Sequence, residues 1–182
     1  MKKQRAKYSV LSLLLLLFVA PGVAAYLFYQ HPSWLSPSRV NKGVLLTSPL
    51  RLASIPGTTK WRIVFWSPEA CDQSCLSQLD VLARVRLALG RRLYQVDQLL
   101  ISGHAETERS MPLSNALKEK DFTVRVLTAS ELTQLRALST QAQIFIMDPD
   151  NYLILSYQAG ANPDDVYKDL KLLLNTAETK NG

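Results

Sequence analysis

The feature that most constrains this chain is an uncharged apolar stretch near its beginning. From Val10 to Phe28 no residue carries a charge, and six apolar residues, Leu13 to Phe18, follow one another inside it. In a lipid core the backbone has to satisfy its own hydrogen bonds, so a segment of this length crosses a bilayer as a helix. The sequence therefore predicts one transmembrane anchor over residues 10–29.

Basic residues before the stretch predict its orientation. Four of them precede it, namely Lys2, Lys3, Arg5 and Lys7. No basic residue follows it closely, and positive charges tend to stay on the cytoplasmic side. We therefore expect residues 1–9 to be a cytoplasmic N-terminus. In a bacterial cell, this makes the chain a single-pass protein of the inner membrane with its C-terminal domain in the periplasm.

A cleaved signal peptide is the competing interpretation. Its apolar region would end at Ala20, and Pro21-Gly22 with the small residues Val23 to Ala25 would precede the cut. The apolar continuation Tyr26 to Tyr29 favours an uncleaved anchor, because such aromatic residues are common at membrane interfaces. Both interpretations place the rest of the chain outside the cytoplasm.

The net charge argues against one class of partner. The formal charge is +6, and the first nine residues supply four of these charges, which leaves +2 for the rest of the chain. A nucleic-acid-binding domain carries a larger basic excess gathered on one face. We therefore expect no nucleic-acid partner.

Residues 30–60 are predicted to form a linker and N-terminal extension, with a short strand at 44–46. Four prolines discourage helix in this stretch: Pro32, Pro37, Pro49 and Pro56. Residues 61–175 are predicted to form a single folded domain, and residues 176–182 a flexible tail.

Short β-favouring runs alternate with helical patterns in the folded part. A central strand is predicted at 61–66, a helix that ends near Gly90, and a second strand at 96–101. Strands joined by a helix of this length lie parallel with a right-handed crossover, so this is a βαβ unit. A polar loop at 102–112 follows.

Further elements continue the alternation. They are a short helix at 113–120, a strand at 122–127, and a helix opened by the capping box Thr128 to Glu131.

The last part of the domain predicts a β-hairpin and a closing helix. Two β-rich runs at 143–147 and 152–157 flank the turn-forming tetrapeptide Asp148 to Asn151. The final helix begins with Asn162 as N-cap and Pro163 at its first position. A βαβ unit followed by a hairpin and a helix is the plan of an α/β thioredoxin-like fold, a mixed sheet with flanking helices.

The only two cysteines, Cys71 and Cys75, directly follow the predicted central strand. A strand end that meets a helix N-terminus is the usual ligand-binding edge of an open α/β sheet. Backbone amides and the helix dipole stabilise a thiolate there, and thiolates attack disulfides and bind soft metals such as Cu(I). The spacing permits both a reversible disulfide and a shared Cu(I). A purely structural disulfide stays open, although so small a ring adds little stability.

The cysteine motif and its surroundings resemble the Sco/SenC family over roughly residues 61–174. The likeness lies in the strand before Cys71, the segment Ile144 to Asp150, and the strand Leu153 to Tyr157 with the helix after it. Members of that family are membrane-anchored thioredoxin-fold proteins that deliver copper to cytochrome c oxidase. The resemblance implies a role in cytochrome c oxidase assembly, by Cu(I) delivery or by thiol reduction at the copper site. The implied partner is an oxidase subunit or another assembly factor.

Two departures from the family pattern concern the copper ligands. Family members have a distal histidine shortly before the Asp-Pro hairpin, whereas Leu138 to Ile144 contains none here. Asp72 stands where a proline commonly follows the first family cysteine. His104 follows the second predicted strand, at the same sheet edge as the cysteines, and is the candidate third metal ligand beside Cys71 and Cys75. A solvated loop residue is the alternative for His104.

Three functions remain open from the sequence. The first is the oxidase assembly factor implied by the resemblance. The second is enzymatic, a general thiol-disulfide oxidoreductase in which Cys71 attacks and Cys75 resolves the mixed disulfide. The third is a non-catalytic interaction domain whose disulfide is structural.

Overall fold

The computed structural model describes residues 2–30, 41–104 and 111–181. The chain forms two compact units, Met1–Arg39 and Val40–Gly182, which are described separately. Residues 31–40 of the predicted linker lie outside the described residues, and so does much of the polar loop predicted at 102–112.

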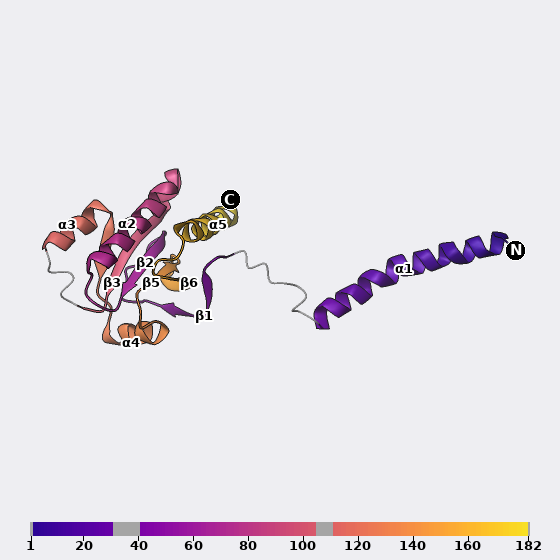
Figure 1. Ribbon diagram of the computed structural model, residues 1–182, viewed down its shortest axis with the longest axis horizontal. Coiled ribbons are helices and arrows are strands. Elements are labelled where there is room, and N and C mark those ends of the chain that lie inside the picture. Colours follow the sequence, from indigo (N-terminus) through magenta and orange to yellow (C-terminus); the bar gives the residue numbers. More distant parts are fainter. Residues whose placement is uncertain (1, 31–40, 105–110, 182) are drawn as a thin grey trace. The chain divides into compact units, whose positions relative to one another are not determined.

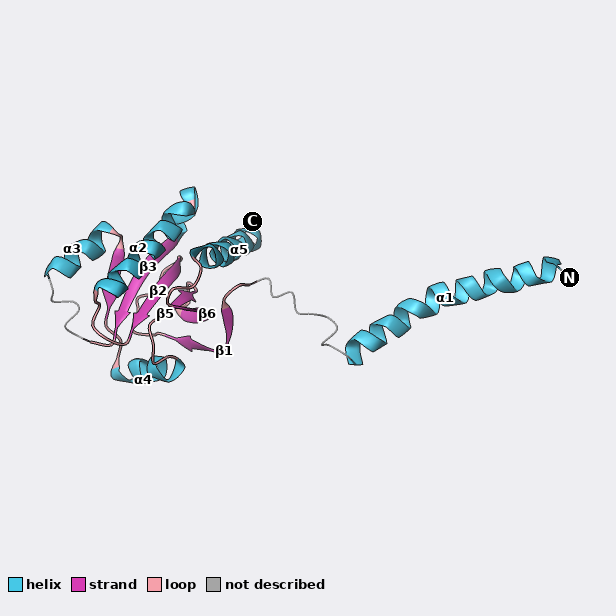
Figure 2. Ribbon diagram, in the orientation of Figure 1, coloured by secondary structure: helices cyan, strands magenta, loops and turns pink. Residues whose placement is uncertain are grey.

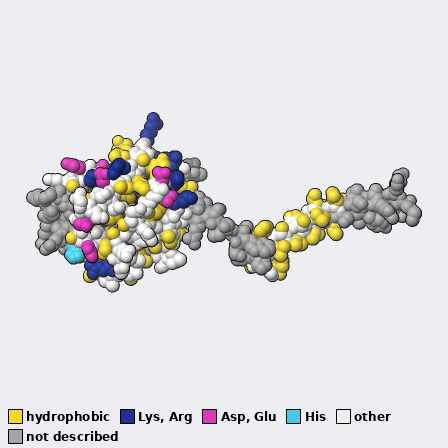
Figure 3. Space-filling model, viewed as in Figure 1, with side chains coloured by type: hydrophobic (Ala, Val, Ile, Leu, Met, Phe, Trp, Pro, Cys, Tyr) yellow, Lys and Arg dark blue, Asp and Glu magenta, His cyan; other side chains and the backbone are white. Residues whose placement is uncertain are grey.

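The first unit contains one long helix, α1 (Lys2–Gln30). Its segment Leu13–Gln30 has a mean hydropathy of 1.9 and is long enough to cross a membrane. The apolar side chains of this segment are exposed over its length (Figure 3). The expected N-terminal apolar helix is therefore confirmed by length and composition, while its orientation in a membrane stays a prediction.

The second unit is built on one six-stranded sheet in the order β1-β6-β5-β2-β3-β4 (Figure 1). The strands are β1 (Val44–Arg51), β2 (Trp61–Ser67), β3 (Val96–Ser102), β4 (Phe122–Arg125), β5 (Gln143–Met147) and β6 (Tyr152–Gln158). Strands β2, β3 and β4 are parallel, whereas β5, β6 and β1 continue the sheet antiparallel. The sheet is therefore mixed, as expected.

Helices cover both faces of the sheet (Figure 2). They are α2 (Gln73–Ala88), the 3₁₀ helix η2 (Gly90–Gln95), α3 (Met111–Glu119), α4 (Ala129–Leu138) and α5 (Pro163–Asn181). Residues of α2, α3 and α5 share one buried cluster, and a residue of α4 belongs to the other.

The central strand β2 supplies side chains to both clusters. Ile63 and Phe65 pack on the face of α2 and α5, and Val64 and Trp66 pack on the face of α4. This division follows from the period of a strand, in which successive side chains point to opposite faces. The nearly uninterrupted apolar run of β2 is thus explained by burial on both sides.

Most local signals in the sequence match the structure. The β2-α2-β3 unit, the β5-β6 hairpin and the capping box of α4 are all present. Asn162 accepts a hydrogen bond from the Asp164 amide at 3.1 Å, as expected of the N-cap of α5. Gly90 ends α2 with φ of +61°.

Several element boundaries differ from the predicted ones. Strand β1 continues to Arg51 rather than ending at 46, and its register with β6 shifts between Leu45 and Leu50. Pro49 is tolerated there because β1 is an edge strand. Strand β4 ends at Arg125, and α5 continues to Asn181, within the segment predicted as a tail.

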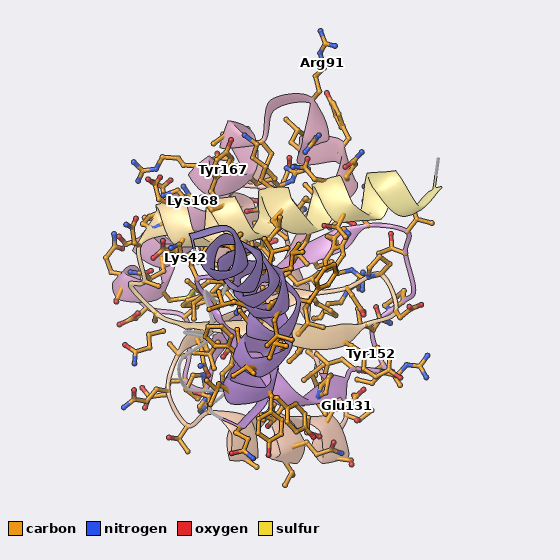
Figure 4. All side chains as sticks on the ribbon, turned by 90° about the vertical axis from the view of Figure 1, so that its right-hand side faces the viewer. Lys42, Arg91, Glu131, Tyr152, Tyr167 and Lys168 are labelled. Atoms are coloured by element: carbon orange, nitrogen blue, oxygen red, sulfur yellow. A yellow bond between two sulfur atoms is a disulfide. The ribbon has the colours of Figure 1, made fainter. Side chains whose placement is uncertain are left out.

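Two buried carboxylates hold the chain on either side of β1, and we call them the β1 clamps. Asp169 on α5 accepts hydrogen bonds from the amides of Lys42 and Gly43 and, at 2.7 Å, from the hydroxyl of Tyr157. Glu131 on α4 accepts from the Ser54 amide at 2.9 Å and from Thr128. In Figure 4, Lys42 lies beside α5 and Glu131 lies on α4, on opposite sides of the sheet.

Both clamps shift the pKa of a buried side chain. Burial raises the pKa of the Tyr157 phenol, and its hydrogen bond to Asp169 adds to the effect. For Glu131, burial alone would raise the pKa, but the hydrogen bonds from Ser54 and Thr128 outweigh it and hold the pKa at about 2.

Candidate functional site

Cys71 and Cys75 form a disulfide at the junction of β2 and α2, with their Cα atoms 5.2 Å apart. Cys75 lies in the first turn of α2 and is only 6% exposed, whereas Cys71 precedes the helix and is partly exposed. The pair therefore joins one partly exposed cysteine to one buried cysteine.

Asp72 fixes the first turn of α2. Its backbone is extended, and its side-chain Oδ1 accepts the Cys75 amide at 2.9 Å, which makes it the N-cap. The sequence analysis noted Asp72 only as a departure from the family pattern, although Asp immediately before a helix is a common N-cap signal. One of the amides expected to stabilise a thiolate is thus already bound to a carboxylate.

The loop after β3 supports the loop that carries the cysteines. The Gly103 amide donates to the Ser67 carbonyl at 2.8 Å. A Cβ at Gly103 would lie 2.2 Å from the Pro68 carbonyl oxygen, so no side chain fits there without movement. His104 is the next residue; its side chain is exposed and its amide donates to Ser102 Oγ at 3.1 Å.

A cavity of about 510 Å³ opens beside the disulfide. The cysteine loop and the start of α2 form one side, and the segment before β5 forms the facing wall. Its lining residues are Phe65, Ser67, Pro68, Glu69, Ala70, Asp72, Ser74, Cys75, Gln78, Thr140, Gln141, Ala142 and Ala159.

The facing wall is the stretch in which the resemblance implies a histidine. Thr140, Gln141 and Ala142 occupy it and line the cavity. Trp66 supports this wall from the opposite face of the sheet, since its indole N–H donates to the Ser139 carbonyl at 3.1 Å. The wall therefore presents neutral groups to the cysteines.

The predicted site residues are only partly brought together. Cys71 and Cys75 are joined, but of the three predicted residues only Cys75 lines the cavity. Within the described part of the chain, no group of three or more His, Cys, Asp and Glu residues could hold a metal ion. The three-ligand site of Cys71, Cys75 and His104 stays a prediction.

Solved structures with a related fold are similar at low identity. Copper-bound ScoI from Bradyrhizobium japonicum is 20% identical with a TM-score of 0.44, over 68% of this chain and 96% of that one. Copper-bound ScoI from Arabidopsis thaliana is 15% identical with a TM-score of 0.49, over 73% and 98%. The thioredoxin domain of a thiol-disulfide oxidoreductase from Bacteroides vulgatus is 15% identical with a TM-score of 0.44, over 63% and 79%. These likenesses are too distant to assign a function.

The family comparison is more decisive for the fold. No curated protein matches the chain. A family model described as the transmembrane-like, thioredoxin-like, C-terminal domain matches residues 61–177. This range contains β2 through most of α5, including the cysteine loop and the facing wall. Because the match covers more than half of the sequence, the chain belongs to this thioredoxin-like family.

Proposed function

We propose that this protein is a membrane-anchored thiol-disulfide factor that assists cytochrome c oxidase assembly through Cys71 and Cys75. The observation that carries the proposal is the disulfide at the start of α2, with one accessible cysteine and an adjoining cavity. A disulfide that served stability alone would need neither a partly exposed cysteine nor the open space beside it.

The proposed reaction uses the two sulfurs in different roles. In the reduced domain, the thiolate of Cys71 attacks one sulfur of a client disulfide, and one client thiolate leaves and takes up a proton. The thiolate of Cys75 then attacks the Cys71 sulfur, which closes the internal disulfide and releases the second client thiol. Two electrons pass to the client, so an external dithiol reductant has to reduce the pair before the next cycle.

The exposure of the two cysteines supports this assignment of roles. Cys75 is only 6% exposed, although it lines the cavity, so we assign it the resolving role. Cys71 is partly exposed ahead of the helix. The cavity beside the pair offers room for an extended client segment during the mixed-disulfide stage.

The proposed client and location come from the sequence. The Sco/SenC resemblance supplies cytochrome c oxidase, whose copper-site cysteines must be reduced before they bind metal. The basic residues in the first turns of α1, ahead of its apolar segment, favour an inner-membrane anchor with the folded unit in the periplasm.

The exchange reaction can be tested directly. The full chain, reduced in an uncharged detergent, is mixed with an oxidised two-cysteine peptide, and thiols are counted by alkylation and mass spectrometry. We expect Cys71→Ser to be inactive and Cys75→Ser to trap a mixed disulfide through Cys71. Exchange in Cys71→Ser at the unaltered rate would overturn the proposal.

A cellular experiment tests the client. In a strain that carries Cys71→Ser and Cys75→Ser together, we expect oxidase activity and the signal of its copper centre to fall. Full oxidase activity in that strain would contradict the oxidase role and favour an interaction domain with a structural disulfide.

Cu(I) carriage by the reduced pair is the second candidate. The specific observation in its favour is that two cysteine sulfurs meet at an accessible sheet edge, and Cu(I) accepts two or three soft ligands. A Cu(I) titration of the reduced chain against a competing chelator tests it. Copper binding should be lost in Cys71→Ser and weakened in His104→Ala; copper retained in Cys71→Ser would exclude the pair as the carrier.

A further inference from the structure

The charged residues around the cysteine cavity have one sign. Among the described residues that line it, Glu69 and Asp72 are acidic and none is Lys, Arg or His. Both side chains are exposed, and they flank Cys71 at two residues before it and one residue after it. The cysteine that lines the cavity is Cys75, so a client segment that enters the cavity beside the disulfide passes two negative charges.

Asp72 cannot easily turn away from the disulfide. Its carboxylate is the N-cap of α2 and accepts the Cys75 amide at 2.9 Å, so its charge stays beside the sulfurs. Glu69 lies in the loop that leads to Cys71, and its backbone carbonyl accepts the Ser67 hydroxyl at 3.0 Å. Hydrogen bonds therefore fix the backbone that carries Glu69 and the side chain of Asp72.

Three basic side chains among the described residues have other partners. Arg84 on α2 and Lys120 both pair with Asp80, at 2.5 Å. Arg136 on α4 donates to the carbonyl of Gly103 at 3.3 Å. None of these three residues lines the cavity, so the negative potential of its mouth is not offset from within.

We infer that the cavity selects client cysteines flanked by Lys or Arg, with Glu69 and Asp72 as the specificity-determining residues. This inference rests on the proposed thiol exchange. In a concave site the field of fixed charges is focused, so an oppositely charged segment gathers there and a like-charged one is repelled. This electrostatic attraction raises the rate at which the client meets the cavity. It also stabilises the mixed disulfide, in which the client residues lie next to both carboxylates.

The test compares two oxidised peptides that differ only in charge. Each peptide has the same length and one internal disulfide, flanked either by two arginines or by two glutamates. For each peptide we measure the rate of exchange with the reduced full chain in an uncharged detergent. This rate is divided by the rate at which the same peptide reacts with 2-mercaptoethanol, which corrects for the intrinsic reactivity of the peptide. We expect the arginine peptide to react roughly fivefold to tenfold faster in 10 mM salt. At 1 M salt, where the Debye length is about 3 Å, the difference should fall below about twofold.

Three variants identify the residues responsible. Glu69→Gln removes a charge, and Asp72→Asn removes a charge while keeping an N-cap acceptor. Each should reduce the preference by about twofold to threefold. Asp150→Asn is the matched control, because this exposed acidic residue lies in the β5-β6 turn, at the sheet edge opposite the cysteines. It should leave the preference unchanged.

The outcomes separate the inference from the proposed function. Exchange with both peptides at equal normalised rates, or a preference unaltered in Glu69→Gln and Asp72→Asn, would overturn the charge selection while thiol exchange stands. Failure of both peptides to exchange would overturn the proposed function, and the selection with it.

Discussion

The β1 clamps and the cysteine edge use carboxylates in opposite ways. Asp169 and Glu131 are buried, and backbone amides or hydroxyls on segments distant in the chain donate to each of them. Asp72 and Glu69 are exposed, and the side chain of Asp72 caps its own helix. The comparison indicates that stability is concentrated where β1 is held to the helices, while the edge that meets a partner keeps accessible charge.

Removing Asp169 should have the largest effect on stability. In Asp169→Ala the amides of Lys42 and Gly43 and the hydroxyl of Tyr157 lose a buried acceptor. We expect the free energy of unfolding to fall by about 3–4 kcal/mol, measured by denaturant titration. Asp164→Asn, an exposed change in the first turn of α5, is the control and should cost below about 1 kcal/mol. Equal losses of stability in both variants would contradict the view that the buried carboxylates stabilise the fold more than the exposed ones.

Glu131 should make the folded unit acid-sensitive. Its pKa is lowered from 4.5 to about 2 in the folded protein, so the unfolded chain takes up its proton first as the pH falls. Stability from this group is fully present above about pH 4.5 and is lost progressively as the pH falls through 2. Glu131→Gln should lose about 2–3 kcal/mol at pH 7 and show a weaker decline in stability between pH 4.5 and 2. An unchanged acid profile in this variant would rule out Glu131 as the cause.

Gly103→Ala tests whether the cysteine edge depends on its supporting loop. The added Cβ would meet the Pro68 carbonyl oxygen at 2.2 Å, so the cysteine loop has to move. We expect a loss of about 1–2 kcal/mol and, more specifically, a shift in the equilibrium of the Cys71–Cys75 disulfide with glutathione. Gly57→Ala is the matched control, because nothing lies within 4 Å of a Cβ there. A redox equilibrium that is identical in both variants would show that the loop does not position the cysteines.

Reduction of the disulfide should have the smallest effect on stability. The bond closes a ring between positions only four apart, so it constrains the unfolded chain weakly. We expect reduction to lower the free energy of unfolding by about 1 kcal/mol, in contrast to the loss of thiol exchange in Cys71→Ser. A loss as large as that of Asp169→Ala would instead assign the disulfide a structural role.

Local signals explain how much of the fold could be predicted. The apolar run of β2, the turn from Asp148 to Asn151 and the capping box at Thr128 each act within a few residues, and each structure formed as expected. Strand β1 was predicted too short because Pro49 interrupts its pattern, and pairing with β6 across more than a hundred residues decides its length. The N-terminal apolar helix, which is long enough to cross a membrane, followed from length and hydropathy alone.

The candidate site was less predictable because its parts meet only in three dimensions. The position of Cys71 and Cys75 after a strand predicted their sheet edge, and their spacing permitted the disulfide without requiring it. Only the family resemblance, through its distal histidine, pointed to the stretch that contains Thr140 to Ala142. No local pattern indicated that these residues would face the cysteines, since β5 is paired with β2 through tertiary contacts. The same holds for the support of the cysteine loop by Gly103. His104 follows β3 as expected, yet the edge position alone did not determine where its side chain lies.

The attachment at Asp169 also has a mechanical consequence. A pull on the chain ahead of Lys42 is borne first by the hydrogen bonds to Asp169 and by the close packing of Gly43 on the ring of Tyr157. That load passes into α5 and the outer strands β1 and β6, and β5 separates these strands from β2. That load therefore reaches the disulfide at the end of β2 only through β5 and through the packing of α5 on α2, and not from β1 directly.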